Sequence, residues 1–486
     1  MTKKTRNILF FSLVALFILT APLIVFYSLG WRFDWETKKI TRPGIFYFKI
    51  YPKNAQIYLN GKFEEKTDFF FGSALVEDLL PQKYNVEIKK EGFHNWSKTL
   101  EIKKLKATEI KNVVLVPESP PFTTAHEKIE EFFFSPDNKK VILREKIVPS
   151  DKSPTIQEES WELKLFEIDK NIKSHLIKEG DIFPNHDFAR ASSTEPLDLN
   201  FSLDSKRAVL KLTEGEEPIY YILRIDNTSP ISTHLDFLTS EIKKIDFNPK
   251  NDQKLFALLF SSNEAGEFKK TLNEIDLADE KISEPIVENI IDYSITNNEI
   301  YYLDNSGFIF KADFSFNQRE KLNITPFSLK QSADYQITSI SSYIVIKEDE
   351  RLHLFNKENK SLKKISESVK GFEISSDSKK LACFNNHEVW VLFLEEITSQ
   401  PQKKAGDQVF LTRFSEKIGK VFWYTNHYLI FNVEGKIKII EIDDRDTINI
   451  VDLIEFKESE IFWNWYSKKL YVLINENLFT SEKLTP

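Results

Sequence analysis

The sequence predicts an all-β ectodomain behind one N-terminal transmembrane helix, composed of a small β-sandwich and a seven- or eight-bladed β-propeller. Three observations predict this architecture. An uncharged apolar run occupies residues 8–29. Alternating strands and tight turns fill residues 44–116, and a strand–turn–strand pattern recurs along residues 122–486.

The composition argues against two classes of protein. A chain of 486 residues with 41% hydrophobic and 13% aromatic residues can bury a sizeable core, which argues against global disorder. The net charge of −8, with acidic and basic residues interspersed, argues against a nucleic-acid partner. The single cysteine, Cys383, cannot form an intramolecular disulfide. Its apolar neighbours predict a buried side chain and not a reactive nucleophile.

The apolar run is long enough to cross a membrane. As a helix, residues 8–29 would span about 33 Å against a hydrocarbon layer of about 30 Å. The run is longer than the apolar region of a cleaved signal peptide, and no small-residue cleavage site follows it. We therefore predict an uncleaved signal anchor within residues 1–30, with a cleaved signal peptide as the alternative.

The charges around this segment barely decide its orientation. Three basic residues precede the run and four follow it: Lys3, Lys4 and Arg6, then Arg32, Lys38, Lys39 and Arg42. The charge rule for membrane orientation is therefore nearly balanced. A short basic leader before the first apolar run is the usual export arrangement, so we expect a cytoplasmic N-terminus and extracytoplasmic C-terminal domains.

Residues 44–116 predict a small β-sandwich. Ala55, Ile57 and Leu59 share one face of a strand, because alternate residues of a strand point to the same side. Asn60 and Gly61 follow, and both tolerate the positive φ of a tight hairpin. Residues 84–88 alternate in the same way and supply another half-buried strand.

These residues resemble the PEGA domain family. The resemblance rests on Pro-Lys-Asn-Ala at 52–55, Tyr-Leu-Asn-Gly-Lys at 58–62, Leu-Leu-Pro-Gln-Lys-Tyr-Asn-Val at 79–86 and Glu-Gly-Phe at 91–93. The chain departs from the family at Gln82, where glycine is usual, at 66–68, and in the insertion at 69–72. The resemblance implies a bacterial, extracytoplasmic β module of the cell envelope, without catalytic residues. Residues 117–121, which contain three prolines, then predict a semi-rigid linker.

The remaining chain, residues 122–486, is a repeated β array. An aromatic or isoleucine residue, an Asp/Asn/Ser turn and a basic residue recur at 134–141, 201–208 and 374–381, and more weakly at 247–255 and 465–470. The spacing averages roughly 47 residues, which is close to the period of four-stranded propeller blades. Candidate blades are centred near residues 140, 208, 256, 301, 344, 381, 428 and 470. The one near 344 is the weakest, so seven blades stay an alternative to eight.

The turns of this array resemble those of TolB-like and WD40-like propeller repeats. The resemblance concerns the repeat pattern and does not fix a function, because propellers host many functions. The last blade offers only three strands, so we expect a strand near 122–129 to complete it and close the ring. We interpret 146–160 and 173–196 as long loops.

A search for chemistry finds no catalytic, cofactor-binding or metal-binding signature. The histidines are scattered without ligand spacing: His94, His126, His175, His186, His234, His353, His387 and His427. No nucleophile elbow, phosphate loop or dinucleotide fingerprint occurs. The acidic segment 443–446 lacks calcium-loop spacing and predicts a solvated turn between blades. The aromatic clusters at 422–424 and 463–465 predict core packing rather than a sugar platform.

The sequence therefore predicts a membrane-anchored extracytoplasmic binding or scaffold protein, with no cofactor and no nucleic-acid partner. Its propeller would present a surface to envelope proteins or to cell-envelope carbohydrate. One alternative is a glycosidase- or lyase-type enzyme that uses acidic residues in the propeller funnel. Such an enzyme requires two carboxyl groups about 5–10 Å apart. The other alternative is an envelope structural protein without a small ligand.

Overall fold

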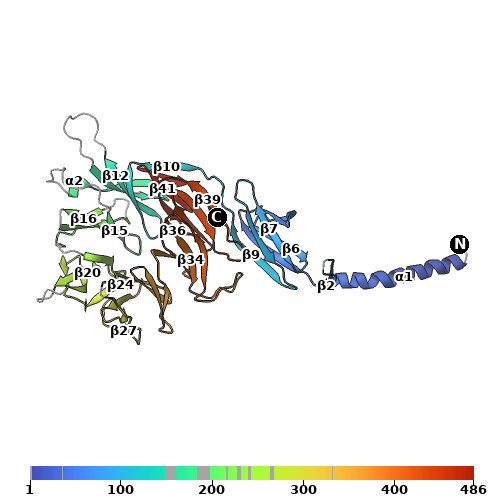
Figure 1. Cartoon of the computed structure of the whole chain (residues 1–486). Coiled ribbons are helices and arrows are strands. Elements are labelled where there is room, and N and C mark those ends of the chain that lie inside the picture. Colours follow the sequence, from blue (N-terminus) through green and yellow to red (C-terminus); the bar gives the residue numbers. More distant parts are fainter. Residues whose placement is uncertain are drawn as a thin grey trace, which may run out of the picture.

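The structure is a computed structural model that describes residues 3–35, 37–147, 160–182, 197–214, 217–226, 231–238, 242–262, 268–330 and 332–485. The molecule is elongated, with a long helix at one end, a small β-sandwich in the middle and a ring of β-sheets at the other end (Figure 1). The fold is therefore the mostly-β architecture that the sequence predicts.

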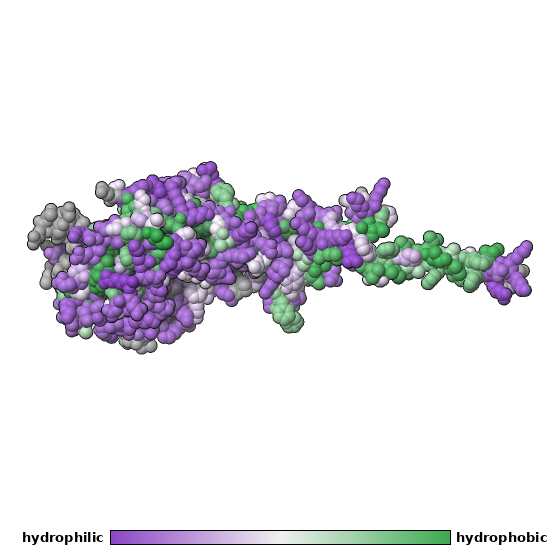
Figure 2. Space-filling model, turned by 90° about the horizontal axis from the view of Figure 1, so that it is seen from below, coloured by the Kyte–Doolittle hydropathy of each residue, from purple (hydrophilic) through white to green (hydrophobic). Residues whose placement is uncertain are grey.

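The N-terminal helix α1 (Lys3–Ser28) leaves its apolar side chains exposed along its length (Figure 2). Its length and composition fit a single membrane span, although a signal sequence would share both properties. Gly30 ends the helix at a φ of +79°, a backbone conformation that glycine adopts without strain. A short hairpin of β1 (Arg32–Asp34) and β2 (Lys39–Thr41) follows.

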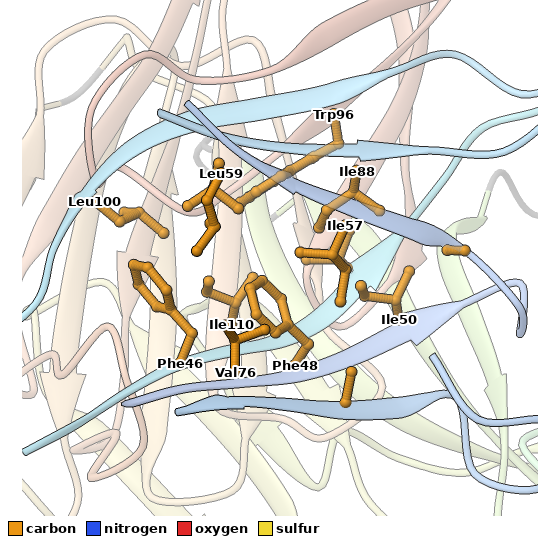
Figure 3. Close-up of a cluster of buried hydrophobic side chains, with 14 of the residues drawn as sticks. Phe46, Phe48, Ile50, Ile57, Leu59, Val76, Ile88, Trp96, Leu100 and Ile110 are labelled. Carbon is orange, nitrogen blue, oxygen red and sulfur yellow. The ribbon is translucent and has the colours of Figure 1, made fainter. Parts of the chain in front are cut away.

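The β-sandwich has two facing sheets. One sheet contains β3 (Gly44–Tyr51) between β6 (Ser73–Leu79) and β9 (Ala107–Val114), and the other has β5 (Lys62–Lys66), β4 (Gln56–Leu59), β7 (Lys83–Lys89) and β8 (Trp96–Glu101) in that order. Side chains from both sheets interdigitate in one buried core, which includes Phe46, Ile57 and Ile88 (Figure 3). The predicted hairpin is confirmed, because Asn60 and Gly61 have φ angles of +49° and +77° between β4 and β5.

The propeller contains eight sheets, which we number as blades 1 to 8. Blade 1 contains β11 (Ile129–Phe134), β12 (Lys140–Ile147), β13 (Ser160–Glu167) and β14 (Ile172–Lys178), and blade 2 contains β15 (Asp198–Phe201), β16 (Arg207–Glu214), β17 (Glu217–Arg224) and β18 (Ile231–His234). Blade 3 contains β19 (Ile242–Phe247), β20 (Lys254–Ser262), β21 (Phe268–Asp276) and β22 (Lys281–Ile282), with β23 (Val287–Glu288) also paired with β21. Blade 4 contains β24 (Ile290–Ile295), β25 (Ile300–Asp304), β26 (Ile309–Ala312) and β27 (Arg319–Lys321). Blade 5 contains β28 (Tyr335–Ile340), β29 (Tyr343–Glu348), β30 (Arg351–Asn356) and β31 (Leu362–Ser366), and blade 6 contains β32 (Gly371–Ile374), β33 (Lys380–Phe384), β34 (Glu388–Phe393) and β35 (Gln408–Arg413). Blade 7 contains β36 (Ile418–Thr425), β37 (Tyr428–Val433), β38 (Lys436–Glu441) and β39 (Ile450–Glu455). Blade 8 contains β40 (Glu460–Asn464), β41 (Lys469–Ile474) and β42 (Asn477–Ser481), and β10 (Phe122–Glu127) is its fourth strand.

Each predicted blade centre lies in the second strand of one blade, including the uncertain centre near residue 344, which lies in β29. The ring therefore has eight blades and not seven. The predicted closure is also confirmed, because β10 pairs antiparallel with β42 from Phe122↔Ser481 to Glu127↔Asn477. This pairing joins the start of the propeller to its end and supplies the fourth, outer strand of blade 8.

The prediction of a long loop at 173–196 is wrong for its first part. Residues there form β14 and a short helix, α2 (Glu179–Ile182). β14 is the outer strand of its blade and buries only Leu176 and Ile177, so its composition is as polar as that of a loop. Residues 146–147 and 160 belong to strands, and the rest of both predicted loops, 148–159 and 183–196, lies outside the described residues.

The proline-containing segment 117–121 does not separate the two folded parts. Val116, just before it, is buried among propeller side chains. The Glu118 N–H donates to Gly92 O at 3.0 Å, which ties the segment back to the sandwich. The sandwich and the propeller are therefore packed against each other through the start of the linker.

Candidate binding site

The recurring turn lies between the first and second strands of a blade and is held by one serine hydroxyl. In blade 1, Ser135 Oγ donates to Asp137 Oδ1 at 2.6 Å and accepts from Lys140 N at 3.1 Å. The same pattern occurs at Ser202 and Ser375. Each of these serines is at least 97% buried. The repeated motif is thus a structural turn, and its repetition explains why sequence spacing revealed the blades.

These turns gather at one face of the ring. The strands of a blade alternate in direction, so the first-to-second and third-to-fourth turns lie at the same end. The first strands of neighbouring blades contact each other: β32 contacts β36, and β36 contacts β40. These first strands line the central channel. The channel therefore opens, at this face, between the C-terminal ends of the first strands.

A pocket at this opening has a volume of about 620 Å³. The ends of β36 and β40 line it with aromatic side chains: Phe422, Trp423, Tyr424, Phe462, Trp463 and Trp465. The end of β32 adds Glu373 and Ile374. Polar side chains complete the rim, where Ser376 Oγ donates to Asn426 Oδ1 at 2.8 Å. The size and the mixture of aromatic and sparse polar groups are typical of a binding site.

The indole groups of the pocket differ in the hydrogen bonds and in the exposure of their rings. Trp423 Nε1 donates to Glu373 O at 2.9 Å, which fixes its ring. Trp463 is 3% exposed, and its buried Nε1 has no hydrogen-bond acceptor among the described residues. A buried donor without a partner costs about 1–3 kcal/mol. Trp465, by contrast, is 53% exposed at the rim.

Among the described residues, Glu373 is the only acidic one that lines this pocket. Burial raises the pKa of its carboxyl group to about 7. No hydrogen bond or ion pair reaches the carboxyl group from the described part of the chain. Glu373 can therefore donate or accept a hydrogen bond near neutral pH, because both protonation states are populated.

The opposite wall of the channel contains a smaller pocket of about 160 Å³, lined by ends of β19, β24 and β28. Its charged groups already have partners. Asp246 Oδ1 accepts from Asn200 Nδ2 at 3.0 Å, and Lys244 forms an ion pair with Asp292 at 3.2 Å. The aromatic pocket is therefore the better candidate for a ligand.

The sandwich docks on the same face as the pocket, against blade 7. Lys98 Nζ lies 2.7 Å from Glu441 Oε1, and the two side chains are 0% and 3% exposed. Lys98 Nζ also donates to the carbonyl oxygens of Asp443 and Thr447 at 2.8 and 2.7 Å. Burial raises the pKa of Glu441, and the neighbouring Lys98 opposes that shift.

Further hydrogen bonds satisfy this buried carboxylate. Trp96 Nε1 donates to Glu441 Oε2 at 2.8 Å, and Asn449 donates to Oε1 from its side chain at 2.7 Å. A charge buried with a full set of partners fixes one arrangement, because any other docking leaves the charge unpaired. The interface is thus specific, and it orients the pocket relative to the sandwich.

The acidic segment 443–446 forms part of this interface. It is the turn between β38 and β39 of one blade, and not a turn between blades as predicted. Arg445 bonds to Asp443 at 2.6 Å and donates to Glu109 O in the sandwich at 2.8 Å. Asp446 Oδ2 accepts from Thr99 N at 2.6 Å. The acidic charges serve docking, which the sequence could not indicate because their partners lie more than 300 residues away.

Of the other residues considered in the sequence, Cys383 is fully buried, as predicted, and burial raises the pKa of its thiol. Groups of three or more potential metal ligands do not occur among the described residues. His186 lies outside those residues. The aromatic clusters are core residues in part, since Trp423, Tyr424 and Trp463 are buried. Glu373, Lys98 and Glu441 were not indicated by the sequence, in which nothing distinguishes them from other charged strand residues.

No family model matches the sequence, and no curated protein matches it. Solved structures with propeller folds do match. The propeller domain of Cps50 (Swd1) from Myceliophteria thermophila is 10% identical, with a TM-score of 0.38, over 74% of this chain and 99% of that one. BamB from Moraxella catarrhalis is 9% identical, with a TM-score of 0.41, over 74% and 97%. The designed protein Ika8 is 10% identical, with a TM-score of 0.43, over 76% and 99%.

Proposed function

We propose that this chain is a membrane-anchored, extracytoplasmic binding protein that presents the aromatic channel pocket to a protein partner in the cell envelope. The observation that carries the proposal is that pocket, about 620 Å³ in volume, on a propeller docked to the sandwich by the buried Lys98–Glu441 pair. The apolar α1 beyond the sandwich supports the anchor. The ligand site is thereby held at a fixed geometry relative to the sandwich.

The extracytoplasmic side is supported by the sequence features of the sandwich. Its resemblance to the PEGA domain, around residues 52–62 and 79–93, implies a module of the bacterial cell envelope. The short basic leader before α1 agrees with export of the C-terminal part. The same two features support a single-pass protein whose sandwich serves as a stalk between the membrane and the propeller.

A protein partner fits the pocket better than a carbohydrate does. Sugars stack on flat, exposed aromatic faces, whereas Trp423 and Trp463 are 9% and 3% exposed. Partly buried aromatic groups around a concavity are typical of protein interaction hot spots. Trp465, which is 53% exposed, is the side chain best placed to contact a partner at the rim.

The enzyme alternative receives less support. Hydrolysis by the glycosidase mechanism requires a pair of carboxyl groups. Glu373 is the one acidic residue that lines the aromatic pocket, and Asp246 is the one that lines the opposite pocket. Asp246 already accepts a hydrogen bond from Asn200. Among the described residues, neither of these two channel pockets is lined by the pair of carboxyl groups that this chemistry needs.

Site-specific photo-crosslinking in cells tests the proposal. A photoreactive phenylalanine derivative replaces Trp465 at the pocket rim or, as the control, Leu362, a 39% exposed residue on the outer strand β31. We expect a discrete protein adduct from position 465 only. Adding Ser376→Arg, which places a large cation at the rim, should abolish that adduct. Identical adducts from both positions, or an adduct that Ser376→Arg leaves intact, would contradict a binding role for the pocket.

A further inference from the structure

Basic side chains from two distant parts of the sequence meet where α1 enters the sandwich. The hairpin of β1 and β2, with the residues after it, supplies Lys38, Lys39 and Arg42. The turn between β8 and β9 supplies Lys103, Lys104 and Lys106. We call these six residues the juxtamembrane collar.

The contacts around Trp31 bring the two segments together. The guanidinium carbon of Arg42 lies 4.8 Å from the centre of the Trp31 ring, and Lys104 Nζ lies 5.5 Å from it. Leu105 N donates to Pro43 O at 3.2 Å, which fixes the second turn beside the first. Trp31 lies three residues after the end of α1, and its N–H donates to Phe26 O at 2.9 Å. The collar is thus attached to the end of the apolar helix.

Among the described residues, most of the collar charge is not neutralised. Lys103 lies 3.8 Å from Glu101, and the neighbouring Arg32 is paired with Asp78 at 2.9 Å. The other collar cations make no ion pair within the described residues: Lys38, Lys39, Arg42, Lys104 and Lys106. The whole chain has a net charge of −8, so this positive region stands out against an acidic protein.

Exposed apolar side chains accompany these cations. Trp35 is 82% exposed, Leu105 is 63% exposed and Ile40 is 56% exposed. Figure 2 shows the green surface of α1 adjoining one end of the sandwich. Tryptophan and lysine together are typical of the boundary between hydrocarbon and headgroups, where indoles insert and ammonium groups remain in water.

We infer that the juxtamembrane collar binds the phosphate headgroups of anionic phospholipids. The occupant is a lipid, because the collar continues the helix that enters the bilayer and because its free charge is complementary to an anionic headgroup. A guanidinium and several ammonium groups supply donors to phosphate oxygens, while Trp35 and Leu105 contact the acyl-chain boundary. This binding goes beyond the proposed partner recognition and applies on whichever side of the membrane the sandwich lies.

Native mass spectrometry of the full chain in neutral detergent tests the inference. The protein is titrated with phosphatidylglycerol or, separately, with phosphatidylcholine of the same acyl chains. We expect discrete phosphatidylglycerol adducts in excess of phosphatidylcholine adducts. The variant Lys38→Gln/Lys39→Gln/Lys104→Gln/Lys106→Gln should bind phosphatidylglycerol about fivefold more weakly for each lysine that contacts the headgroup.

The matched control removes four exposed lysines from the propeller: Lys206→Gln/Lys250→Gln/Lys363→Gln/Lys457→Gln. It carries the same change in net charge and should bind phosphatidylglycerol as the unmodified chain does. Equal binding of the two lipids, or equal weakening by the collar and control variants, would overturn the inference. Melting temperatures measured in parallel should stay unchanged, because all of the substituted side chains are exposed.

Discussion

Replacing Lys98 with methionine tests the docking of the sandwich on the propeller. The substitution leaves Glu441 buried without its cation, although Trp96 and Asn449 still donate to it. Removing one partner of a buried ion pair costs about 3–5 kcal/mol. Protonation limits this cost. Protonating a carboxyl group of ordinary pKa 4.5 at pH 7 costs 2.5 pKa units at about 1.36 kcal/mol each, or about 3.4 kcal/mol.

Hydrogen exchange of the full chain in detergent at pH 7.5 measures the effect. We expect Lys98→Met to speed exchange in β8 and in the turn between β38 and β39 by about 100-fold, which corresponds to about 3 kcal/mol. The effect should shrink toward pH 5, because Glu441 then takes up a proton and the unpaired charge disappears.

Two further variants decide the interpretation. Lys98→Met/Glu441→Gln removes both charges, keeps an acceptor for Trp96 and Asn449, and should recover most of the protection. Lys103→Met, at an exposed lysine near the end of β8, should have little effect. If Lys98→Met exchanges like the unmodified chain at pH 7.5, the buried pair does not hold the interface and the reasoning is refuted. An effect that is independent of pH would show that lost packing, and not the unpaired charge, is responsible.

Three more predictions concern the propeller. Deleting residues 122–127 removes β10 from blade 8 and should lower the melting temperature by about 5 °C or more, as measured by scanning calorimetry; an unchanged value would contradict ring closure through β10. Burial raises the pKa of the Glu373 carboxyl group from 4.5 to about 7. The charge on this group therefore destabilises the folded state, by an amount that grows as the pH rises from 4.5 to 7 and stays constant at higher pH. The free energy of unfolding of Glu373→Gln, measured in urea, should therefore exceed that of the unmodified chain by up to about 3 kcal/mol at pH 8 and by almost nothing at pH 4.5. A difference that does not change with pH would refute the raised pKa of Glu373. The thiol of Cys383 should resist maleimide until the chain is unfolded, and rapid labelling of the native protein would show that it is accessible.

The blades could be predicted because each carries its own local signal. The serine of the turn bonds within its own turn, as Ser375 Oγ does with Asp377 Oδ1, so the residues needed are adjacent in sequence. Closure through β10 followed from counting strands, because a last blade with three strands requires a fourth from elsewhere. The outer strand β14 was missed because it buries few side chains and lacks the alternation that marks an inner strand.

The site and the interface could not be predicted for the opposite reason. Lys98 and Glu441 are 343 positions apart, and each is an ordinary charged residue in an alternating strand. Glu373 has a raised pKa only because the ring encloses it. Lys104 reaches Trp31 only because the sandwich brings the turn between β8 and β9 to the end of α1. Such properties arise from tertiary packing and leave no local pattern.

The membrane location of the propeller is the central claim, and protease accessibility in intact cells tests it most directly. An epitope tag at the C-terminus, which follows β42, reports on the propeller. External protease should remove the tag from intact cells, while a cytoplasmic control protein stays protected. Protection of the tag in intact cells, with cleavage only after the membrane is permeabilised, would place the propeller inside the cell and contradict the proposed function.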